Sequence, residues 1–183
     1  LAQLDGQKYY MAHALMGSLL GEGAEILQTM KGQALCGTEY LPLFEAQYPA
    51  GNKHFVVCDP YVSLTDGTGI VHIAPAFGED DARVGRDNGL PFVQLVNTQG
   101  AFVEGTPWAG MPTGEVNARV LADLKERGLL FAAVPFTHNY PFCWRCDTPL
   151  LYYARATWFI RMTEVRDRLM ANNQTVHWMP ENI

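Results

Sequence analysis

Residues 66–81, Asp-Gly-Thr-Gly-Ile-Val-His-Ile-Ala-Pro-Ala-Phe-Gly-Glu-Asp-Asp, form the most informative stretch of this sequence. The Gly-Thr-Gly start predicts a tight turn, because glycine takes a positive φ and lets the backbone approach a ligand closely. The β-branched residues that follow predict a short half-buried strand, which Pro75 ends. A bend at Gly78 leads to three acidic residues, which favour the positive end of a helix dipole. The stretch therefore predicts that an imidazole, His72, and a carboxylate, Asp81, meet where a strand turns into a helix.

The composition indicates a globular protein with one domain and an appendage. The chain has 183 residues, of which 48% are hydrophobic and 17% are charged. No apolar run is long enough to span a bilayer, so we expect no membrane partner. The net charge of −6 argues against a freestanding nucleic-acid binder, although other domains could deliver an RNA end to it. Neither end carries a terminal signature, and we expect both to be cuts inside a longer protein.

The four cysteines fall into two groups. Cys36 and Cys58 stand alone in apolar surroundings and are expected to be buried small hydrophobes. Cys143 and Cys146 form a Cys-x-x-Cys pair, which is half of a tetrahedral zinc site. The alternatives are free or oxidised thiols and a redox-active pair, the last disfavoured because no βαβ unit surrounds it. Nothing indicates a secreted disulfide scaffold, so a reducing, cytoplasmic setting is expected.

Hydrophobic periodicity predicts many short strands, frequent turns and a few helices. This pattern suggests a closed or nearly closed sheet with helices on its outside. The predicted class is α+β, mainly β, with a β-barrel-like body and flanking helices. Helices are expected in the second part of 9–20 and over 80–88, 115–127 and 164–172. Strands are expected over 24–30, 54–58, 70–73, 91–96, 101–103, 129–134 and 151–160. Residues 41–51 are expected to form a surface loop.

Two long motifs resemble a known family. Residues 67–81 closely resemble the editing-domain signature of isoleucyl-tRNA synthetases. Residues 138–150, His-Asn-Tyr-Pro-Phe-Cys-Trp-Arg-Cys-Asp-Thr-Pro-Leu, with Trp-Phe-Ile at 158–160, resemble the segment that leaves this inserted domain. Residues 173–180 look like the strand that returns toward the aminoacylation core. The resemblance implies an editing domain body over 1–136 and an exit segment over 137–183. Valyl enzymes typically have a lysine and leucyl enzymes a methionine where His72 stands, which favours the isoleucyl family.

The function that this resemblance implies follows from a physical limit. A pocket built for isoleucine cannot strongly reject valine, because one methylene contributes only about 1–3 kcal/mol. The family removes such errors in a second site that is too small for isoleucine. The resemblance therefore implies hydrolysis of valine from the tRNA for isoleucine, with valyl-adenylate as a further candidate substrate. The implied partners are the 3′ acceptor end of that tRNA and the rest of the synthetase chain.

The resemblance also assigns the site, with His72 and Asp81 as its catalytic set. Asp81 is implied to pair with the α-ammonium group of the substrate, which agrees with the strength of charge-assisted hydrogen bonds. The alternative is that Asp81 only favours a helix N-terminus. His72 is implied to line the pocket wall that excludes the larger side chain, although a lone histidine in a strand is usually a core residue. A general-base role for His72 is open by residue type but not favoured.

The glycine turn is implied to face the ribose of the substrate. Thr68 has an alternative use, which is to satisfy the backbone of the turn. No serine or cysteine stands in a nucleophile setting, so a covalent mechanism has no support. The complete set of expected substrate-binding residues is Gly67, Thr68, Gly69, His72, Ala74, Phe77 and Asp81.

Some parts of the family pattern are not in this sequence. The family's editing site also uses a threonine-rich strand of the Thr-Thr-Thr-Pro-Trp-Thr type, and Thr106-Pro107-Trp108 is only superficially similar to it. We therefore expect one wall of the pocket to come from outside this sequence. No cofactor is expected within the sequence itself, whereas the zinc half-site of Cys143 and Cys146 would be completed in the full-length protein. Trp108, Trp144 and Trp158 are expected to pack in the core, with stacking on RNA as the alternative.

Four other functions were weighed against proofreading. The first is a non-catalytic module that docks the tRNA acceptor end, and the second is the editing domain of a valyl- or leucyl-type synthetase. A stand-alone editing factor is disfavoured by the abrupt ends of the chain. A zinc-ribbon binding protein is disfavoured because only one Cys-x-x-Cys pair is present.

Overall fold

A small antiparallel sheet lies at the N-terminal end of the chain. The computed structural model describes residues 1–44 and 54–180. Strand β1 (Ala2–Leu4) is central and pairs with β2 (Gln7–Tyr9) on one side and β3 (Glu25–Ile26) on the other. The turn between β1 and β2 is Asp5-Gly6, with φ of 50° and 79°. Positive φ at both central residues is the type I′ hairpin turn, which Asp-Gly favours.

Short helices connect β2 to β3. A 3₁₀ turn, η1 (His13–Leu15), leads into α1 (Met16–Leu20) and a second 3₁₀ turn, η2 (Gly21–Gly23). Helix α1 ends where Gly21 takes a φ of 70°, which an L side chain rarely adopts. The predicted short helix ended by glycine is thus confirmed. Leu15 and Leu20 are buried together with Ala2 of β1, and they form the local core.

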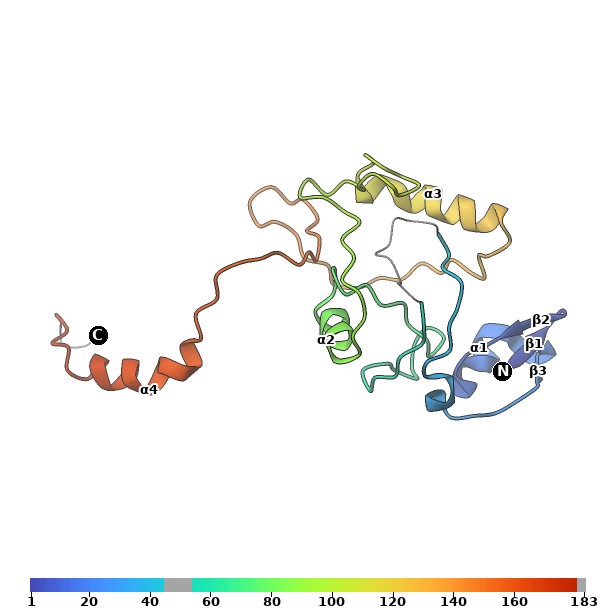
Figure 1. Cartoon of the computed structure of the whole chain (residues 1–183), viewed down its shortest axis with the longest axis horizontal. Helices are drawn as coiled ribbons and strands as arrows, with labels where there is room; N and C mark the ends of the chain where they lie inside the picture. Colours follow the sequence, from blue (N-terminus) through green and yellow to red (C-terminus); the bar gives the residue numbers. More distant parts are fainter. Residues whose placement is uncertain (45–53, 181–183) are drawn as a thin grey trace.

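Three longer helices follow. After the 3₁₀ turn η3 (Gly32–Leu35) come α2 (Glu79–Asp87), α3 (Thr113–Glu126) and α4 (Met162–Asn173). Gly89 and Gly128 take φ of 64° and 66° just beyond α2 and α3, as expected of residues that end helices. The sequence predicted these three helices to within about two residues, the accuracy with which helix ends are defined. Figure 1 shows α4 apart from the rest of the chain, at the end of an extended stretch.

The class is mixed α+β, and the described residues do not show the predicted barrel. The sheet has three strands and is open. The helices are longer than the strands, so "mainly β" was wrong. The predicted strands at 54–58, 70–73, 91–96, 129–134 and 151–160 are irregular or extended here. Apart from the sheet, strand-like pairing in the described residues consists of isolated bridges: Glu39 to Phe55, Val96 to Phe102, Ala101 to Pro112 and Phe142 to Pro149. Most of the loop predicted over 41–51 lies outside the described residues.

Val84 of α2 and Val116 of α3 are the largest fully buried side chains in the described chain. Val84 has no exposed surface (0%), whereas Val71 is 48% exposed. Across residues 1–44 and 54–180, no helix has both the length and the apolar character that a membrane crossing requires.

Replacing Val84 by alanine is expected to lower the free energy of unfolding by about 2 kcal/mol. The change removes two buried methyl groups and leaves a cavity behind. The matched control is Val71→Ala, which should change stability by less than about 0.5 kcal/mol because that side chain is half exposed. Urea unfolding followed by circular dichroism measures both. Equal losses would contradict the placement of Val84 in the core.

Candidate functional site

The glycine turn of the signature stretch packs against the N-terminal segment. Gly67 and Gly69 take φ of 62° and 73°. The backbone N–H of Ala12 donates to the carbonyl of Thr68 at 2.8 Å, which ties the turn to the residues ahead of α1. The Thr68 hydroxyl donates to the carbonyl of Ile70 at 3.0 Å and accepts from its N–H at 3.3 Å. The tight turn is confirmed, and the hydroxyl of Thr68 is used by the backbone of the turn.

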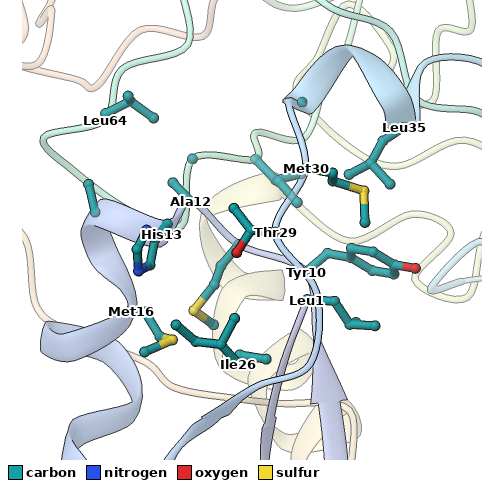
Figure 2. Close-up of a pocket in the computed structure, with 16 residues that line it drawn as sticks. Leu1, Tyr10, Ala12, His13, Met16, Ile26, Thr29, Met30, Leu35 and Leu64 are labelled. Carbon is teal, nitrogen blue, oxygen red and sulfur yellow. The ribbon is translucent and has the colours of Figure 1, made fainter.

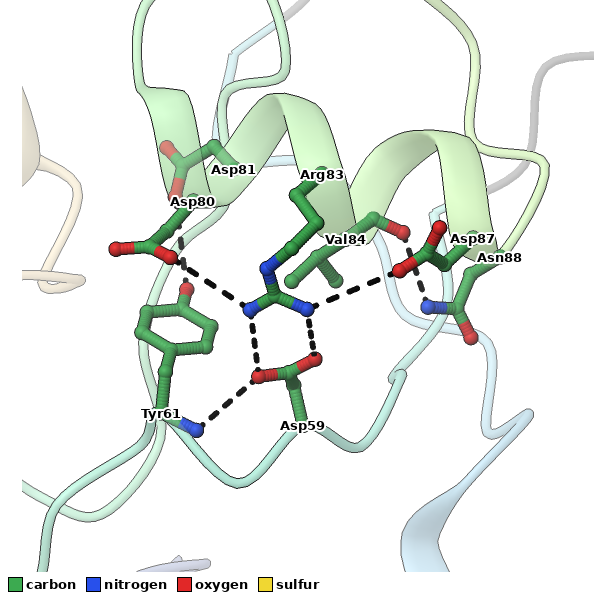
Figure 3. A network of polar contacts seen from close by, with 8 residues as sticks. All are labelled: Asp59, Tyr61, Asp80, Asp81, Arg83, Val84, Asp87 and Asn88. Atoms are coloured by element: carbon green, nitrogen blue, oxygen red, sulfur yellow. Dashed lines mark hydrogen bonds and ion pairs between the residues drawn. The ribbon is translucent and has the colours of Figure 1, made fainter. Parts of the chain in front are cut away.

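Asp81 lies in the first turn of α2 and reaches back over the signature stretch. The backbone N–H of Ala74 donates to Asp81 Oδ2 at 3.0 Å. The Tyr61 hydroxyl lies 3.5 Å from Asp81 Oδ1 and donates to it weakly (Figure 3). Gly78 makes this close fold possible, since a Cβ at that position would lie 2.9 Å from Asp81 Cγ. The carboxylate is partly buried and holds the strand-like run against the start of the helix.

The structure joins Asp81 to Ala74 but does not join it to His72. Among the described residues, the hydrogen bonds of the Asp81 carboxylate run to Ala74 and Tyr61. His72 is exposed, two residues before Ala74 in an extended segment. Among the described residues, no hydrogen bond or ion pair joins the imidazole of His72 to the carboxylate of Asp81. Within residues 1–44 and 54–180, residues 70–73 pair with no strand that would orient alternate side chains toward one face.

The other end of the signature stretch contacts the exit segment. The N–H of Ala154 donates to the carbonyl of Ala76 at 2.9 Å. The rings of Phe77 and Tyr153 meet edge to face, with centroids 6.1 Å apart. The Tyr153 hydroxyl in turn donates to the Val96 carbonyl at 3.1 Å. Phe77, predicted to bind substrate, is thus also part of the packing that joins the two predicted parts of the chain.

An ion-pair network beside Asp81 was not foreseen from the sequence (Figure 3). The guanidinium of Arg83 donates to both oxygens of Asp59 at 2.9 Å. It also lies 3.6 Å from Asp80 and 3.8 Å from Asp87 on its own helix. The i,i+3 and i,i+4 spacing of these helical charges was a readable signal. The partner on the distant loop, Asp59, gave no such signal.

Three residues of the network have shifted pKa values, and for Arg83 the hydrogen bonds to Asp59 raise the pKa. The hydrogen bonds from Arg83, and then the N–H of Tyr61 at 3.1 Å, hold the pKa of Asp59 below its ordinary value. Partial burial, and then the negative charge of Asp81, raise the pKa of Tyr61. Tyr61 therefore stays a neutral hydrogen-bond donor toward Asp81 at neutral pH.

Stability is expected to depend on pH through Asp59. Because folding lowers the pKa of this carboxyl, its contribution is fully present above the ordinary aspartate pKa, about 4, and is lost as pH falls through the folded value. Asp59→Asn should therefore lower the urea midpoint at pH 6 but have little effect near pH 2. Asp87→Asn is the matched control, because Asp87 is more exposed and its distance to Arg83 is longer. A difference between Asp59→Asn and the parent that stays constant with pH would contradict the ion pair.

The Cys143-x-x-Cys146 pair lies on a tight turn. The N–H of Cys143 donates to the Thr148 carbonyl at 2.9 Å, and that of Asp147 donates to the Cys143 carbonyl at 2.8 Å. The thiol of Cys146 contacts the Thr148 hydroxyl at 3.2 Å, and this contact lowers the pKa of Cys146. Within residues 1–44 and 54–180, no group of three or more His, Cys, Asp or Glu side chains is placed to hold a metal ion. These two thiols would supply two of the four ligands of a tetrahedral zinc site.

Two other expectations about side-chain burial were wrong. Cys36 and Cys58 are exposed rather than buried. Trp144 and Trp158 are 87% and 99% exposed rather than in the core. In each case the sequence pattern gave apolar neighbours, but the described chain places no second layer over them.

A largely apolar cavity of about 470 Å³ lies beside the glycine turn (Figure 2). Its walls come from the N-terminal segment, from η1, α1, β3 and η3, from the loop between β3 and η3, and from the glycine turn with the residues before it. Apolar side chains line it: Met16, Ile26, Met30, Leu35 and Leu64. Of the expected site residues, Gly69 lines this cavity, whereas His72, Ala74, Phe77 and Asp81 do not.

Comparison with known proteins agrees with the signature. No family model matches the chain. It is 48% identical over 98% of its length to the isoleucine–tRNA ligase of Clostridium acetobutylicum. The identity is 44% over 97% of the chain for the corresponding ligase of Streptomyces avermitilis, and 43% over 99% for that of Thermus thermophilus. The chain spans 17% of the length of each of these relatives.

The glycine turn, the acidic helix start and the Cys-x-x-Cys turn thus belong to a segment of a class I aminoacyl-tRNA synthetase. Within that class, the chain is homologous to a segment of isoleucyl-tRNA synthetase.

Proposed function

We propose that this segment is the proofreading domain of its synthetase and hydrolyses valine from the tRNA for isoleucine while it excludes isoleucine. Valyl-adenylate is a second substrate of the same chemistry. The observation that supports the proposal best is the Asp81 carboxylate, which Ala74 fixes at 3.0 Å over the signature stretch. A fixed carboxylate offers a cationic amine a partner, and the glycine turn of the same stretch is a backbone that a ribose can approach.

Asp81 keeps acceptor capacity for the substrate. An ionised carboxylate has about four lone-pair sites, and the hydrogen bond from Ala74 uses one of them. The Tyr61 hydroxyl, at 3.5 Å, is a weak competitor for the other oxygen. The α-ammonium group of an esterified valine would take that oxygen, which orients the ester carbonyl for attack by water. His72 would act as a wall against the larger side chain rather than as the base.

The proposal is tested with tRNA for isoleucine that carries valine or isoleucine. The full-length protein should deacylate the valyl ester much faster than the isoleucyl ester. Calorimetric titration of the same protein with non-hydrolysable valyl- and isoleucyl-adenosine analogues reports binding without turnover. Selective release of valine together with selective binding of the valyl analogue supports the proposal. Equal release of both amino acids, or none, contradicts it.

A second candidate function is a non-catalytic module that docks the tRNA acceptor end. The exposed indoles of Trp144 and Trp158 favour it, because aromatic faces stack on unpaired bases. In this case Trp158→Ala would weaken tRNA binding by the full-length protein and leave hydrolysis of the valyl-adenosine ester unchanged. Asp81→Asn would then change neither.

The rest of the synthetase chain is the expected partner of the exit segment. Trp158, Phe159 and Ile160 are 99%, 83% and 73% exposed. Such a contiguous apolar patch commonly marks an interface. Further strands from the parent chain would also be needed to close a barrel. We place the parent protein in the cytoplasm, where its tRNA would be charged.

A zinc site in the full-length protein would take two thiolates from Cys143 and Cys146 and two ligands from elsewhere in the chain. Zinc would fix the Cys143–Cys146 turn, on which Trp144 is exposed. Cys143→Ser should then lower the zinc content of the purified full-length protein, whereas Cys36→Ser should not. A zinc content that is zero in the parent would contradict the site.

A further inference from the structure

Two segments outside the signature stretch pair in antiparallel fashion and bring two cysteines together. Residues 36–40 and 54–58 form what we call the 36–58 ladder. Glu39 bridges to Phe55 at its centre. The N–H of Val56 donates to the Thr38 carbonyl, and that of Tyr40 to the His54 carbonyl, both at 2.9 Å.

The ladder carries a bulge next to the first cysteine. Gly37 takes a φ of 80°, and its N–H donates to the Val56 carbonyl at 2.8 Å. Gly37 and Thr38 therefore both oppose Val56, which is the arrangement of a glycine bulge. Cys36 and Cys58 leave the ladder at the same end, immediately beyond this bulge.

The two thiols are close to one another and open to solvent. Burial raises the pKa of the Cys58 thiol, and so does the nearby Cys36 side chain. The thiol of Cys58 also lies 3.8 Å from the Gly32 carbonyl. The bulge places Cys36 opposite Val57, and Cys58 is the next residue along the partner segment. Both cysteines are exposed, so a small oxidant can reach them.

We propose that Cys36 and Cys58 form an oxidisable dithiol that closes to an intramolecular disulfide across the 36–58 ladder. With a low-molecular-weight disulfide as oxidant, the thiolate of Cys36 attacks one oxidant sulfur and releases the first small thiolate. The thiolate of Cys58 then attacks the mixed disulfide at the Cys36 sulfur and releases the second. Two protein thiols lose two electrons in total, one small disulfide is reduced to two thiols, and the two protons pass to them.

The order of the two attacks follows from the surroundings of Cys58. Burial, and then the neighbouring Cys36, raise the pKa of the Cys58 thiol, so less of it is thiolate at neutral pH. Cys36 therefore takes the mixed disulfide first, and Cys58 resolves it.

The Cys36–Cys58 disulfide would restrain the loop that carries Asp59 and Tyr61 of the ion-pair network. Cys58 directly precedes Asp59, whose two oxygens accept from Arg83 of α2. Two residues further on, Tyr61 contacts Asp81. Oxidation would thus fix one end of the loop whose side chains support the start of α2.

Tryptic mapping of the full-length protein tests the proposal, because Lys53 separates the two cysteines and Arg145 separates the Cys143–Cys146 pair. Native protein is treated with glutathione disulfide, alkylated and digested. We expect peptide 32–53 linked to peptide 54–83, with at least about tenfold more linked than glutathionylated product. In urea, where the ladder is lost, this ratio should fall about tenfold, since closing the loop is no longer assisted.

Cys58→Ser supplies the second arm of the test. With the resolving thiol absent, a stable glutathione adduct should remain on Cys36. Stable glutathione adducts on both cysteines of the native parent protein would overturn the proposal. A linked fraction that is the same in urea as in native buffer would also overturn it, because closure would then not depend on the ladder.

Discussion

Asp81→Asn is expected to lower the rate of valine release from mischarged tRNA by about tenfold to a hundredfold. The substitution removes the negative charge that would pair with the substrate's α-ammonium group. A hydrogen bond to a charged group contributes about 1.5–3 kcal/mol, and each 1.36 kcal/mol is a factor of ten in rate. The asparagine side chain still carries an oxygen that can accept from the N–H of Ala74. The fold around the start of α2 should therefore persist.

Asp81→Ala separates the two roles of this carboxylate. Alanine removes the charge and also leaves the N–H of Ala74 without its partner at 3.0 Å. An unsatisfied partly buried donor costs about 1–3 kcal/mol, so this variant should lose stability as well as activity. The asparagine variant should lose activity alone.

The neighbouring acidic residue is the matched control. Asp80 lies one residue earlier on the same helix turn, is exposed, and contacts Arg83 at 3.6 Å. Asp80→Asn should leave the rate of valine release within about twofold of the parent, since surface ion pairs contribute little. Single-turnover deacylation measures the rate of valine release, and urea unfolding measures the stability, of all three variants. Equal rate losses for Asp80→Asn and Asp81→Asn would contradict a specific amine site at Asp81.

The features that could be predicted from the sequence are those that depend only on neighbouring residues in the chain. Helix α2 follows from its acidic first turn and α3 from its apolar face, and Gly89 and Gly128 end them. The glycine turn follows from residues 67–69 alone. These features need no distant partner, so the single sequence contained all of the required information.

The remaining expectations depended on contacts with residues far away in the sequence, which local patterns do not identify. A β-branched run becomes a strand only when another segment supplies its hydrogen bonds, and in the part of the chain that the structure describes no segment does so for residues 70–73. For the same reason His72 is exposed and does not meet Asp81. Asp59 was missed because its partner Arg83 is distant along the chain.

The cysteines include one pair that could be recognised from the sequence and one pair that could not. The Cys143–Cys146 turn was recognisable, because its spacing is itself the motif. Cys36 and Cys58 were interpreted separately, as two buried hydrophobes. Only the 36–58 ladder brings them together, and a bulge at Gly37 sets their register.

Gly69→Ala is expected to lower the free energy of unfolding by about 3 kcal/mol. A Cβ at this position would lie 2.5 Å from the Cβ of Ala12 and 3.4 Å from its backbone. Overpacking of this kind costs about 1–3 kcal/mol, and the left-handed φ of 73° adds about 1–2 kcal/mol for an L side chain. The strain would act on the hydrogen bond from Ala12 to Thr68 that holds the turn to the N-terminal segment.

Gly67→Ala is the matched control for this effect. Gly67 has a similar φ of 62°, but a Cβ there would meet nothing within 4 Å. The Gly67→Ala variant should therefore lose only the free energy that the left-handed φ costs an L side chain, about 1–2 kcal/mol. Urea unfolding gives the two free energies, and amide hydrogen exchange at Ala12 reports the hydrogen bond to the turn. Faster exchange at Ala12 in Gly69→Ala alone is the expected result, because only that substitution pushes the turn away from the N-terminal segment. Equal losses of stability in the two variants, with unchanged exchange at Ala12, would contradict the contact between the turn and that segment.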